Sequence, residues 1–508
     1  AEIAEVVAKD QRFCGQTGSV GHAVFSQPLE TRRTHVLRHS LTGNRCAERQ
    51  QIGNVSAVPI PRVERSDQIG PNLVEVNAVS GVRRERIADR IASIDAQATR
   101  VDDYNTLRNL QQMYGYYYDE ALWDQIIDLF ADDATLEVEP HGVYVGKASI
   151  RRYFYGLTNG RQGLVQGQLN NQLQLSPVIT LSADGLHAQA RWRAVMQDGV
   201  FNQSANWGTG LYENEYVKQG GVWKIAKLHL YVRFYAPYEG GWTRTTAALN
   251  ERFGKSTAKP DRPTAEHHAT WPTRFVLPMH YAAQGIDNYR LAPANSARAP
   301  APAANAPRSA MQLEAQVRAL ELKLKRLKAV DSLENLESAY GYYADMSMQD
   351  ATSVLFTEDA TLEILGRGVF IGSDRIYEYM RRLGAPTDGR LFTHMQLQPV
   401  ITVSPDGNRA NIRARLFEMF GMNGQQAQWA EGVYENTFVL DNGVWKYQTL
   451  NGYQTFYTDY EKGWGKASNP LMNYFPGYPP DLPHSIEYEP YPAVFVPPFH
   501  YRNPVTGK

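Results

Sequence analysis

The stretch LFADDATLEV at residues 129–138 decides how this chain is organised, because it returns as LFTEDATLEI at residues 355–364. The similarity extends on both sides at a constant offset of 226, from Leu107 and Leu333 onwards. After a four-residue gap it continues at an offset of 222, and the two C-terminal tails agree at an offset of 220. Each unit spans about 190 residues, which is the size of a whole domain rather than of a solenoid repeat. The sequence therefore predicts two tandem copies of one domain.

The composition favours an ordinary soluble globular protein. The 508 residues are 43% hydrophobic and 21% charged, which is enough material for two buried cores. A net charge of −1 provides no field that would gather nucleic acid or an anionic membrane. No stretch approaches the roughly eighteen consecutive apolar residues of a membrane span. We therefore expect neither nucleic-acid binding nor membrane insertion.

Cys14 and Cys46 are the only cysteines, and both precede the repeats. Neither repeated core therefore uses a disulfide, a thiolate nucleophile or a cysteine metal site, although the pair is able to bridge in an oxidising compartment. The sequence starts at Ala1, which suggests removal of a leader, but residues 1–80 lack the charged-then-apolar layout of a signal peptide. These features favour a periplasmic or secreted location.

Shifts in composition predict four segments. Residues 1–84 are polar, Arg-rich and without sustained periodicity, which indicates an extended or poorly ordered segment. Residues 85–290 and 311–508 each combine a leading helix, the repeated unit and a C-terminal tail, and an Ala/Pro linker at 291–310 joins them. The leading helices carry apolar residues at alternating spacings of four and three. Such stripes predict either pairing of the two helices or packing of each helix on its own domain.

Within each copy the periodicity predicts a helix, a short strand pair, a second helix and then long strands. In the first copy, helical spacing covers residues 114–130, and Gly146 opens the second helix. Alternating patterns predict the strands at 165–181, 187–197, 208–218 and 222–235. The simplest arrangement is an α+β fold, in which a curved antiparallel sheet wraps around helices.

The string LFADDATLEV, followed by a glycine, a helix and the pattern GxYENxxVxxxGVWKI, resembles the SnoaL-like branch of the nuclear transport factor 2-like superfamily. The resemblance covers residues 105–242 and 331–464. It implies two tandem cone-shaped domains, each with a deep pocket lined by the first helix and the concave face of the sheet. It does not fix the function, because members include dehydratases, isomerases, cyclases, C–C lyases and binding modules without chemistry.

Ketosteroid isomerase, a member of this superfamily, is similar to the chain from Tyr114 to Thr135. The similarity places Tyr114 and Tyr340 at the position of its oxyanion-stabilising tyrosine. Its catalytic aspartate, however, falls on Val138 and Ile364, which cannot take a proton. Isomerase chemistry is therefore not expected.

Scytalone dehydratase carries a Tyr-Asp pair followed by Trp-Asp, which resembles Tyr118, Asp119, Trp123 and Asp124. Its catalytic histidine is similar in position to His394. The first copy has Gln172 at that position, and the second copy has Ala344 where the first has Tyr118. Neither copy therefore carries the full set of residues.

Strand alternation places a carboxylate on an apolar face in the second copy. Glu418 shares that face with Ile412 and Phe420, whereas the first copy has Met196 at the matching position. Carboxylates on apolar faces generally have a raised pKa or a cationic partner, and His394 is the obvious candidate partner. Such a pair is able to transfer protons without a metal or a cofactor.

We predict that the catalytic residues are Asp345, His394, Glu418, Tyr340 and, in the first copy, Asp119. The substrate-binding residues are predicted to be Tyr114, Tyr118, Tyr343, Trp192 and Trp123. Neither a metal nor a cofactor is expected. Because the first copy lacks a base of suitable pKa, the second copy is predicted to be the better catalyst.

Structural roles are the alternative for most of these residues. Tyrosines on a helix face are more often core residues, and a single histidine is more often a hydrogen-bonded structural group. Asp119 and Asp345 are equally suited to bridging within the domain. Glu213 and Glu435 are expected to make structural contacts, because both copies keep them. The tail residues His280 and His500 lack a second metal ligand at a suitable spacing.

Three functions remain open. The first is a cofactor-independent lyase, either a dehydratase or a retro-aldol-type C–C lyase, that acts on a small aromatic or polycyclic substrate. The second is a protein that binds a small hydrophobic or aromatic molecule without transforming it. The third is a structural module, in which the tandem domains form an internal pseudo-dimer or a homo-oligomer.

Overall fold

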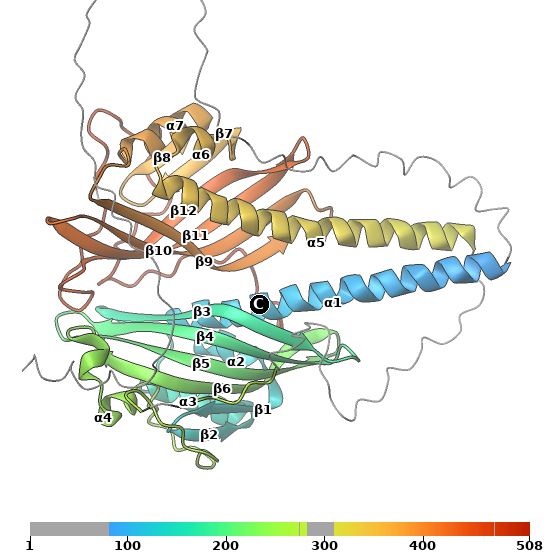
Figure 1. Ribbon diagram of the computed structural model, residues 1–508, viewed down its shortest axis with the longest axis horizontal. Helices are drawn as coiled ribbons and strands as arrows, with labels where there is room; N and C mark the ends of the chain where they lie inside the picture. The colour runs from blue at the N-terminus through green and yellow to red at the C-terminus, as the bar shows by residue number, and fades with distance from the viewer. Residues whose placement is uncertain (1–80, 274, 282–308, 472) are drawn as a thin grey trace, which may run out of the picture. The chain divides into compact units, whose positions relative to one another are not determined.

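The computed structural model describes residues 81–273, 275–281, 309–471 and 473–508 (Figure 1). These residues all belong to one compact unit. Residues 1–80 of the segment expected at 1–84 lie outside the described residues. Residues 291–308 of the linker expected at 291–310 lie outside them as well. Residues 81–84, which we expected to be extended, instead form the first turn of a helix.

The two copies repeat the same order of elements. The first copy contains α1 (Gly81–Asp119), α2 (Trp123–Asp128), β1 (Phe130–Val138), β2 (Gly142–Val145), α3 (Gly146–Leu157), β3 (Gln168–Leu181), β4 (His187–Val200), β5 (Ser204–Gln219), β6 (Val222–Pro237) and the short turns η2 (Gly241–Arg244) and α4 (Ala247–Asn250). The second copy contains α5 (Ala310–Asp345), α6 (Gln349–Ser353), β7 (Phe356–Ile364), β8 (Gly368–Ile371), α7 (Ser373–Arg382), β9 (Arg390–Val403), β10 (Arg409–Met422), β11 (Gln426–Asp441) and β12 (Val444–Asp459). The two α+β domains and the four long strands in each are as predicted.

Each copy forms a six-stranded sheet, with the order β2-β1-β6-β5-β4-β3 in the first and β8-β7-β12-β11-β10-β9 in the second. The sheets are mixed rather than purely antiparallel as expected, because β1 pairs with β6 and β7 pairs with β12 in parallel. No hairpin joins these pairs, so a parallel crossover through the rest of the domain is required. The remaining neighbours are antiparallel.

Matching glycines shape the short hairpin of each copy and allow the tail to cover it. Gly142 has φ +113° and Gly368 has φ +82°, values that other residues rarely adopt. A Cβ atom at Gly142 would lie 2.8 Å from Pro260, and one at Gly368 would lie 2.6 Å from Pro480. Both sequence copies therefore need glycine here for the backbone turn and for the close approach of the following tail.

The two long helices α1 and α5 pair through their leading halves (Figure 1). Their apolar stripes form one cluster that includes Ile91, Ala98, Leu313, Leu320 and Leu327. Pairing of the stripes, the first of the two predicted alternatives, is therefore the one observed. None of the helices in the described residues is long and apolar enough to cross a membrane.

Both C-terminal tails return to their sheets through the same set of side chains. Arg413 binds Glu435, and His500 Nδ1 lies 2.7 Å from another oxygen of Glu435. The first copy repeats this arrangement with Arg191, Glu213 and His280. The expectation that Glu213 and Glu435 make structural contacts is confirmed.

Candidate functional site

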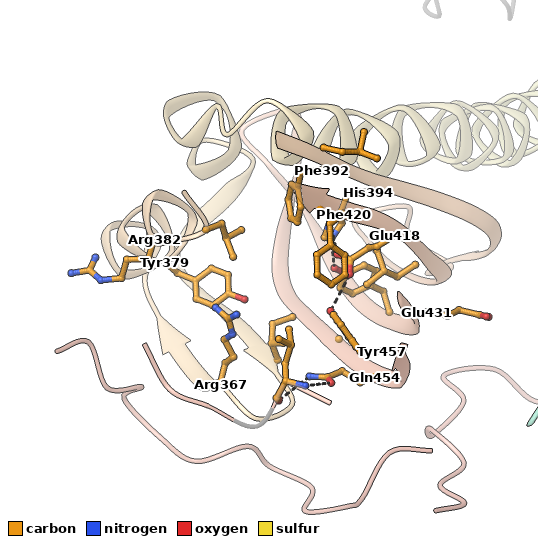
Figure 2. Close-up of a pocket in the computed structure, with 18 of the residues that line it drawn as sticks. Arg367, Tyr379, Arg382, Phe392, His394, Glu418, Phe420, Glu431, Gln454 and Tyr457 are labelled. Atoms are coloured by element: carbon orange, nitrogen blue, oxygen red, sulfur yellow. Dashed lines mark hydrogen bonds and ion pairs between the residues drawn. The ribbon is translucent and has the colours of Figure 1, made fainter. Parts of the chain in front are cut away.

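The second copy contains a cavity of about 340 Å³ (Figure 2). It opens between the sheet strands β9 to β12, the end of α5 and helix α7. Most of its wall is apolar or aromatic, and its polar side chains include Tyr340, Arg367, His394, Glu418, Tyr434, Gln454 and Tyr457. A cavity with a few convergent polar groups in an apolar wall is the usual form of a small-molecule site.

His394 and Glu418 lie side by side in this cavity. They are direct cross-strand partners on β9 and β10, and His394 Nδ1 is 2.7 Å from Glu418 Oε1. The exposed fraction is 9% for His394 and 3% for Glu418, so the pair is withdrawn from bulk water. The ring nitrogen is not aligned for a linear hydrogen bond, so the contact is chiefly electrostatic. The structure brings together the two residues that strand alternation had linked.

Tyrosine hydroxyl groups hold both members of the pair. The Tyr434 hydroxyl lies 3.1 Å from His394 Nε2, and the Tyr457 hydroxyl donates a hydrogen bond of 3.0 Å to Glu418 Oε2. The Tyr340 ring stands edge-on to the His394 ring, with 6.2 Å between centroids. Burial raises the pKa of all three tyrosines well above the ordinary value, so they remain protonated donors at neutral pH.

Asp345 lies beside this group but does not line the cavity. Its Oδ1 accepts a hydrogen bond of 2.5 Å from the backbone N–H of His394. Burial raises the pKa of Asp345, and the backbone hydrogen bond opposes that rise. In the first copy Asp119 accepts the backbone N–H of Gln172 at 2.6 Å in the same way. Asp345 thus anchors the start of β9 through His394, and Asp119 anchors the start of β3 through Gln172.

Asp119 has a second role, at the contact between the copies. Its other oxygen binds the Arg415 guanidinium, which also binds Glu431, and Asn171 donates to Glu431. Burial, partly offset by Arg415, raises the pKa of Glu431 to about 7, and burial likewise raises the pKa of Asp119. Asp119 therefore lies in a buried ion network and outside the cavity. It is not part of the catalytic set that we propose below.

The first copy differs from the second around the histidine position and at one wall of the cavity. Gln172 Nε2 donates to the Tyr212 hydroxyl where the second copy has His394 and Tyr434. The wall glycine Gly452 corresponds to the buried Leu230 in the first copy. The first copy thus lacks both the histidine and part of the space that the second copy retains.

Four of the predicted binding residues lie in the first copy, and two of them share a separate pocket. Tyr118 and Trp123 line a cavity of about 260 Å³ there. Trp192 is fully buried and donates to the Tyr216 hydroxyl, and Tyr114 packs against Tyr118 and Tyr212 outside that pocket. In the second copy, Tyr343 is half-buried and does not line the cavity.

The first-copy pocket also contains a titratable group that sequence reasoning missed. Asp198 lines the pocket, and burial raises its pKa to about 6, opposed by hydrogen bonds from Tyr235 and Asn206. Asp198 is therefore a candidate proton acceptor in the first copy that the sequence prediction did not include. Asp198 lies near the end of β4, where the second copy has Phe420, and local sequence patterns did not indicate a buried carboxyl group there.

Three arginines in the wall of the second-copy cavity were also missed. Arg382 binds Glu378, and Arg390 donates to three backbone carbonyl groups. Arg367 instead lies over the Phe475 ring, 3.9 Å from its centroid. Its Nε and Nη1 atoms are buried, and no described residue accepts a hydrogen bond from them. Arg367 therefore brings a positive charge to the cavity wall.

Comparison with known proteins agrees with this fold. The family profile described as SnoaL-like domain matches residues 99–229 and 325–451, which together make up about half of the chain. No curated protein is significantly similar to the chain.

Three solved structures align with one copy each. A putative scytalone dehydratase from Novosphingobium aromaticivorans DSM 12444 is 23% identical, covering 29% of this chain and 95% of its own, with a TM-score of 0.25. The hexachlorocyclohexane dehydrochlorinase LinA-type3 from Novosphingobium barchaimii LL02 is 21% identical, covering 27% and 92%, with a TM-score of 0.25. An NTF2-like protein with a cystatin-like fold from Novosphingobium aromaticivorans DSM is 20% identical, covering 28% and 87%, with a TM-score of 0.20. The chain belongs to the SnoaL-like domain family and carries two tandem copies of its α+β fold.

Proposed function

We propose that the second copy is a cofactor-independent lyase that acts on a small aromatic substrate, by loss of water or by retro-aldol cleavage. The observation that supports this proposal is the His394–Glu418 pair inside an aromatic-lined cavity. A base held by a carboxylate in a withdrawn pocket is suited to removing a proton next to a carbonyl group.

His394 is the proposed base. Glu418 Oε1 lies beside Nδ1 and favours a proton on that nitrogen, so Nε2 is the proposed basic nitrogen. In the free protein Nε2 lies 3.1 Å from the Tyr434 hydroxyl, and a bound substrate displaces that contact. For dehydration, Nε2 takes the proton on the carbon next to the carbonyl and returns it to the leaving hydroxyl as water departs. For retro-aldol cleavage, Nε2 takes the hydroxyl proton while the C–C bond breaks, and it then returns that proton to the carbon of the enolate that is formed.

Both routes place negative charge on the carbonyl oxygen of the substrate. Tyr340 and Tyr434 line the cavity as protonated hydroxyl donors, which suits them to stabilising that oxyanion. Arg367 adds positive charge elsewhere in the same wall. Asp345 positions the backbone of His394 and takes no proton in this scheme.

A β-hydroxy ketone with an aromatic ring tests the proposal directly. Dehydration of 4-hydroxy-4-phenylbutan-2-one gives benzylideneacetone, whereas retro-aldol cleavage gives benzaldehyde and acetone, and the products are separable by absorbance. We expect turnover by the full chain and a loss of about 10² to 10⁴ in kcat for His394→Gln, which carries the first-copy residue. Binding of benzylideneacetone by that variant should be unchanged.

The second candidate function is binding without chemistry, which the first copy favours for that half of the chain, because it has a pocket of about 260 Å³ but Gln172 in place of His394. Binding of benzylideneacetone by the full chain with neither product released, and with no effect of His394→Gln, would support a binding protein and contradict the lyase. The same measurement on Tyr453→Phe, a cavity residue outside the hydrogen-bonded group, controls for nonspecific damage.

A further inference from the structure

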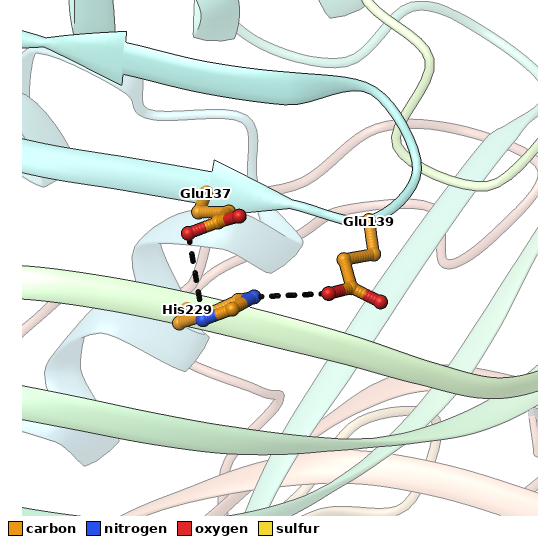
Figure 3. A group of neighbouring side chains, drawn as sticks. All are labelled: Glu137, Glu139 and His229. Carbon is orange, nitrogen blue, oxygen red and sulfur yellow. Dashed lines mark ion pairs between the residues drawn. The ribbon is translucent and has the colours of Figure 1, made fainter. Parts of the chain in front are cut away.

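A buried group of three ligand-type side chains lies in the first copy, in a different domain from the cavity of the proposed lyase (Figure 3). Glu137 is the penultimate residue of β1, Glu139 follows the strand, and His229 lies on β6. Glu137 and His229 are neighbours because β1 and β6 pair in parallel. One ligand atom from each side chain lies within 4.8 Å of the other two.

The distances suit one ion between His229 and Glu139. His229 Nε2 is 3.5 Å from Glu139 Oε1, and neither atom has a hydrogen-bond partner among the described residues. The exposed fractions of the two residues are only 7% and 6%. Two ligand atoms that are each about 2.0–2.1 Å from a tetrahedral zinc ion lie about 3.4 Å apart. The observed separation matches that geometry.

Glu137 and His268 complete the surroundings. Glu137 Oε2 lies 3.5 Å from His229 Nδ1, where a carboxylate would hold the ring and direct Nε2 towards a metal. His268 Nε2 lies 3.8 Å from the same Glu139 oxygen, and its backbone N–H donates to the other oxygen. The tail that carries His268 thus reaches the group.

The local charge also favours a cation. Two buried carboxylates flank one imidazole, which leaves a net negative charge even when the ring is protonated. Tyr231 stacks on His229 with 3.8 Å between ring centroids. An ion of charge +2 would compensate the charge of the two carboxylates.

The second copy provides a natural comparison, because it lacks the group. The second copy keeps a glutamate, Glu363, at the position of Glu137. It has Leu365 at the position of Glu139 and Asn451 at the position of His229. The stacked tyrosine is kept as Tyr453. The surrounding fold therefore does not require the two central ligands, which are a feature of the first copy alone.

We propose that the first copy binds one divalent transition-metal ion of the zinc class, between His229 Nε2 and Glu139 Oε1. Glu137 orients the imidazole, and His268 is the adjacent ligand from the tail. Mixed imidazole and carboxylate ligation suits Zn²⁺ and its neighbours rather than Ca²⁺ or Mg²⁺. A bound ion would link β1, β6 and the tail of the first copy.

The test is a Zn²⁺ titration of the chelator-stripped full chain, without an affinity tag and with Cys14 and Cys46 replaced by serine. Competition with a chromophoric chelator gives stoichiometry and affinity. We expect one equivalent of Zn²⁺ to bind, with an affinity lowered at least about 100-fold by His229→Asn or Glu139→Leu. Both variants carry the second-copy residues and are therefore expected to fold.

Two further variants complete the design. Glu137→Gln should weaken binding by about 10- to 100-fold, as loss of an orienting carboxylate does. His484→Asn removes the histidine that lies 3.3 Å from Glu363 in the second copy, and it should leave binding unchanged. Absence of saturable binding by the full chain, or equal affinity in the full chain and His229→Asn, would overturn the proposal and leave only a buried contact between an imidazole and two carboxylates.

Discussion

Replacement of Glu337 by glutamine should make the protein more stable, and increasingly so as the pH rises. Glu337 lies on α5 with an exposed fraction of 2%, and it accepts hydrogen bonds from Asn436 and Tyr447. Burial raises its pKa from 4.5 to about 7, and the two hydrogen bonds oppose that rise. The first copy has Gln111 at this position, where it accepts from the equivalent asparagine.

The magnitude follows from the difference between the folded and unfolded pKa values. A carboxyl group whose pKa is raised by folding favours the folded state fully below pH 4.5, and this contribution is lost as the pH rises through 7. At 1.36 kcal/mol per pKa unit, the complete loss is about 3 kcal/mol. Between pH 5 and 8.5 it is about 2.5 kcal/mol. Glutamine does not titrate, so the Glu337→Gln variant should lack this dependence.

Urea unfolding followed by circular dichroism at pH 5 and pH 8.5 measures the effect. The difference in unfolding free energy between Glu337→Gln and the parent should increase by about 2 to 3 kcal/mol between the two pH values. The reciprocal variant Gln111→Glu places a carboxyl group in the first core and should show the opposite trend. A difference that stays constant within about 0.5 kcal/mol would refute the reasoning, because the buried carboxyl would then ionise normally.

The remaining predictions concern the cavity and the contact between the copies. Arg367→Gln should weaken the binding of naphthalene-2-carboxylate, monitored by fluorescence, about tenfold. The affinity for the neutral naphthalene-2-carboxamide should change by less than about twofold. Equal effects on both probes would exclude an anion-binding role. Gly452→Leu, which copies Leu230, should reduce binding of both probes by filling the wall, and unchanged affinity would show that the cavity lies elsewhere. Arg415→Ala should lower the unfolding free energy by about 3 to 5 kcal/mol, because two buried carboxylates lose their cation. Its exposed first-copy counterpart Arg193→Ala should change stability by less than about 0.5 kcal/mol, and similar losses for the two would contradict the buried network.

The sequence allowed the strands and the central pair of the site to be predicted, because both depend on local alternation. Glu418 interrupts an apolar face of one strand, and His394 lies near the start of the neighbouring strand, so antiparallel register brings them together. Contacts between the copies were not predictable in this way. The partner of Asp119 is Arg415, which lies 296 residues further along the chain.

The parallel strand pair was the other feature that local patterns did not predict. We expected an antiparallel sheet, in which Glu137 and His229 have no reason to be neighbours. Their register on β1 and β6 arises from a crossover that involves the whole domain. Arg367 was missed for a related reason, because a charged residue in a turn is usually exposed, and only the folded tail shows that its guanidinium lies over Phe475.

The two faces of strand β10 contact different parts of the molecule. Arg415 points to the other copy and Glu418 points into the cavity, three positions apart and hence on opposite sides of the strand. Glu431 connects the two sides, since it lines the cavity and also binds Arg415. A second domain expressed alone would leave Arg415 without Asp119 and loosen the strand that holds the proposed acid–base pair. The Arg415–Asp119 contact thus ties the cavity-bearing strand to the first copy, so cutting the chain between the copies should impair the proposed reaction as well as stability.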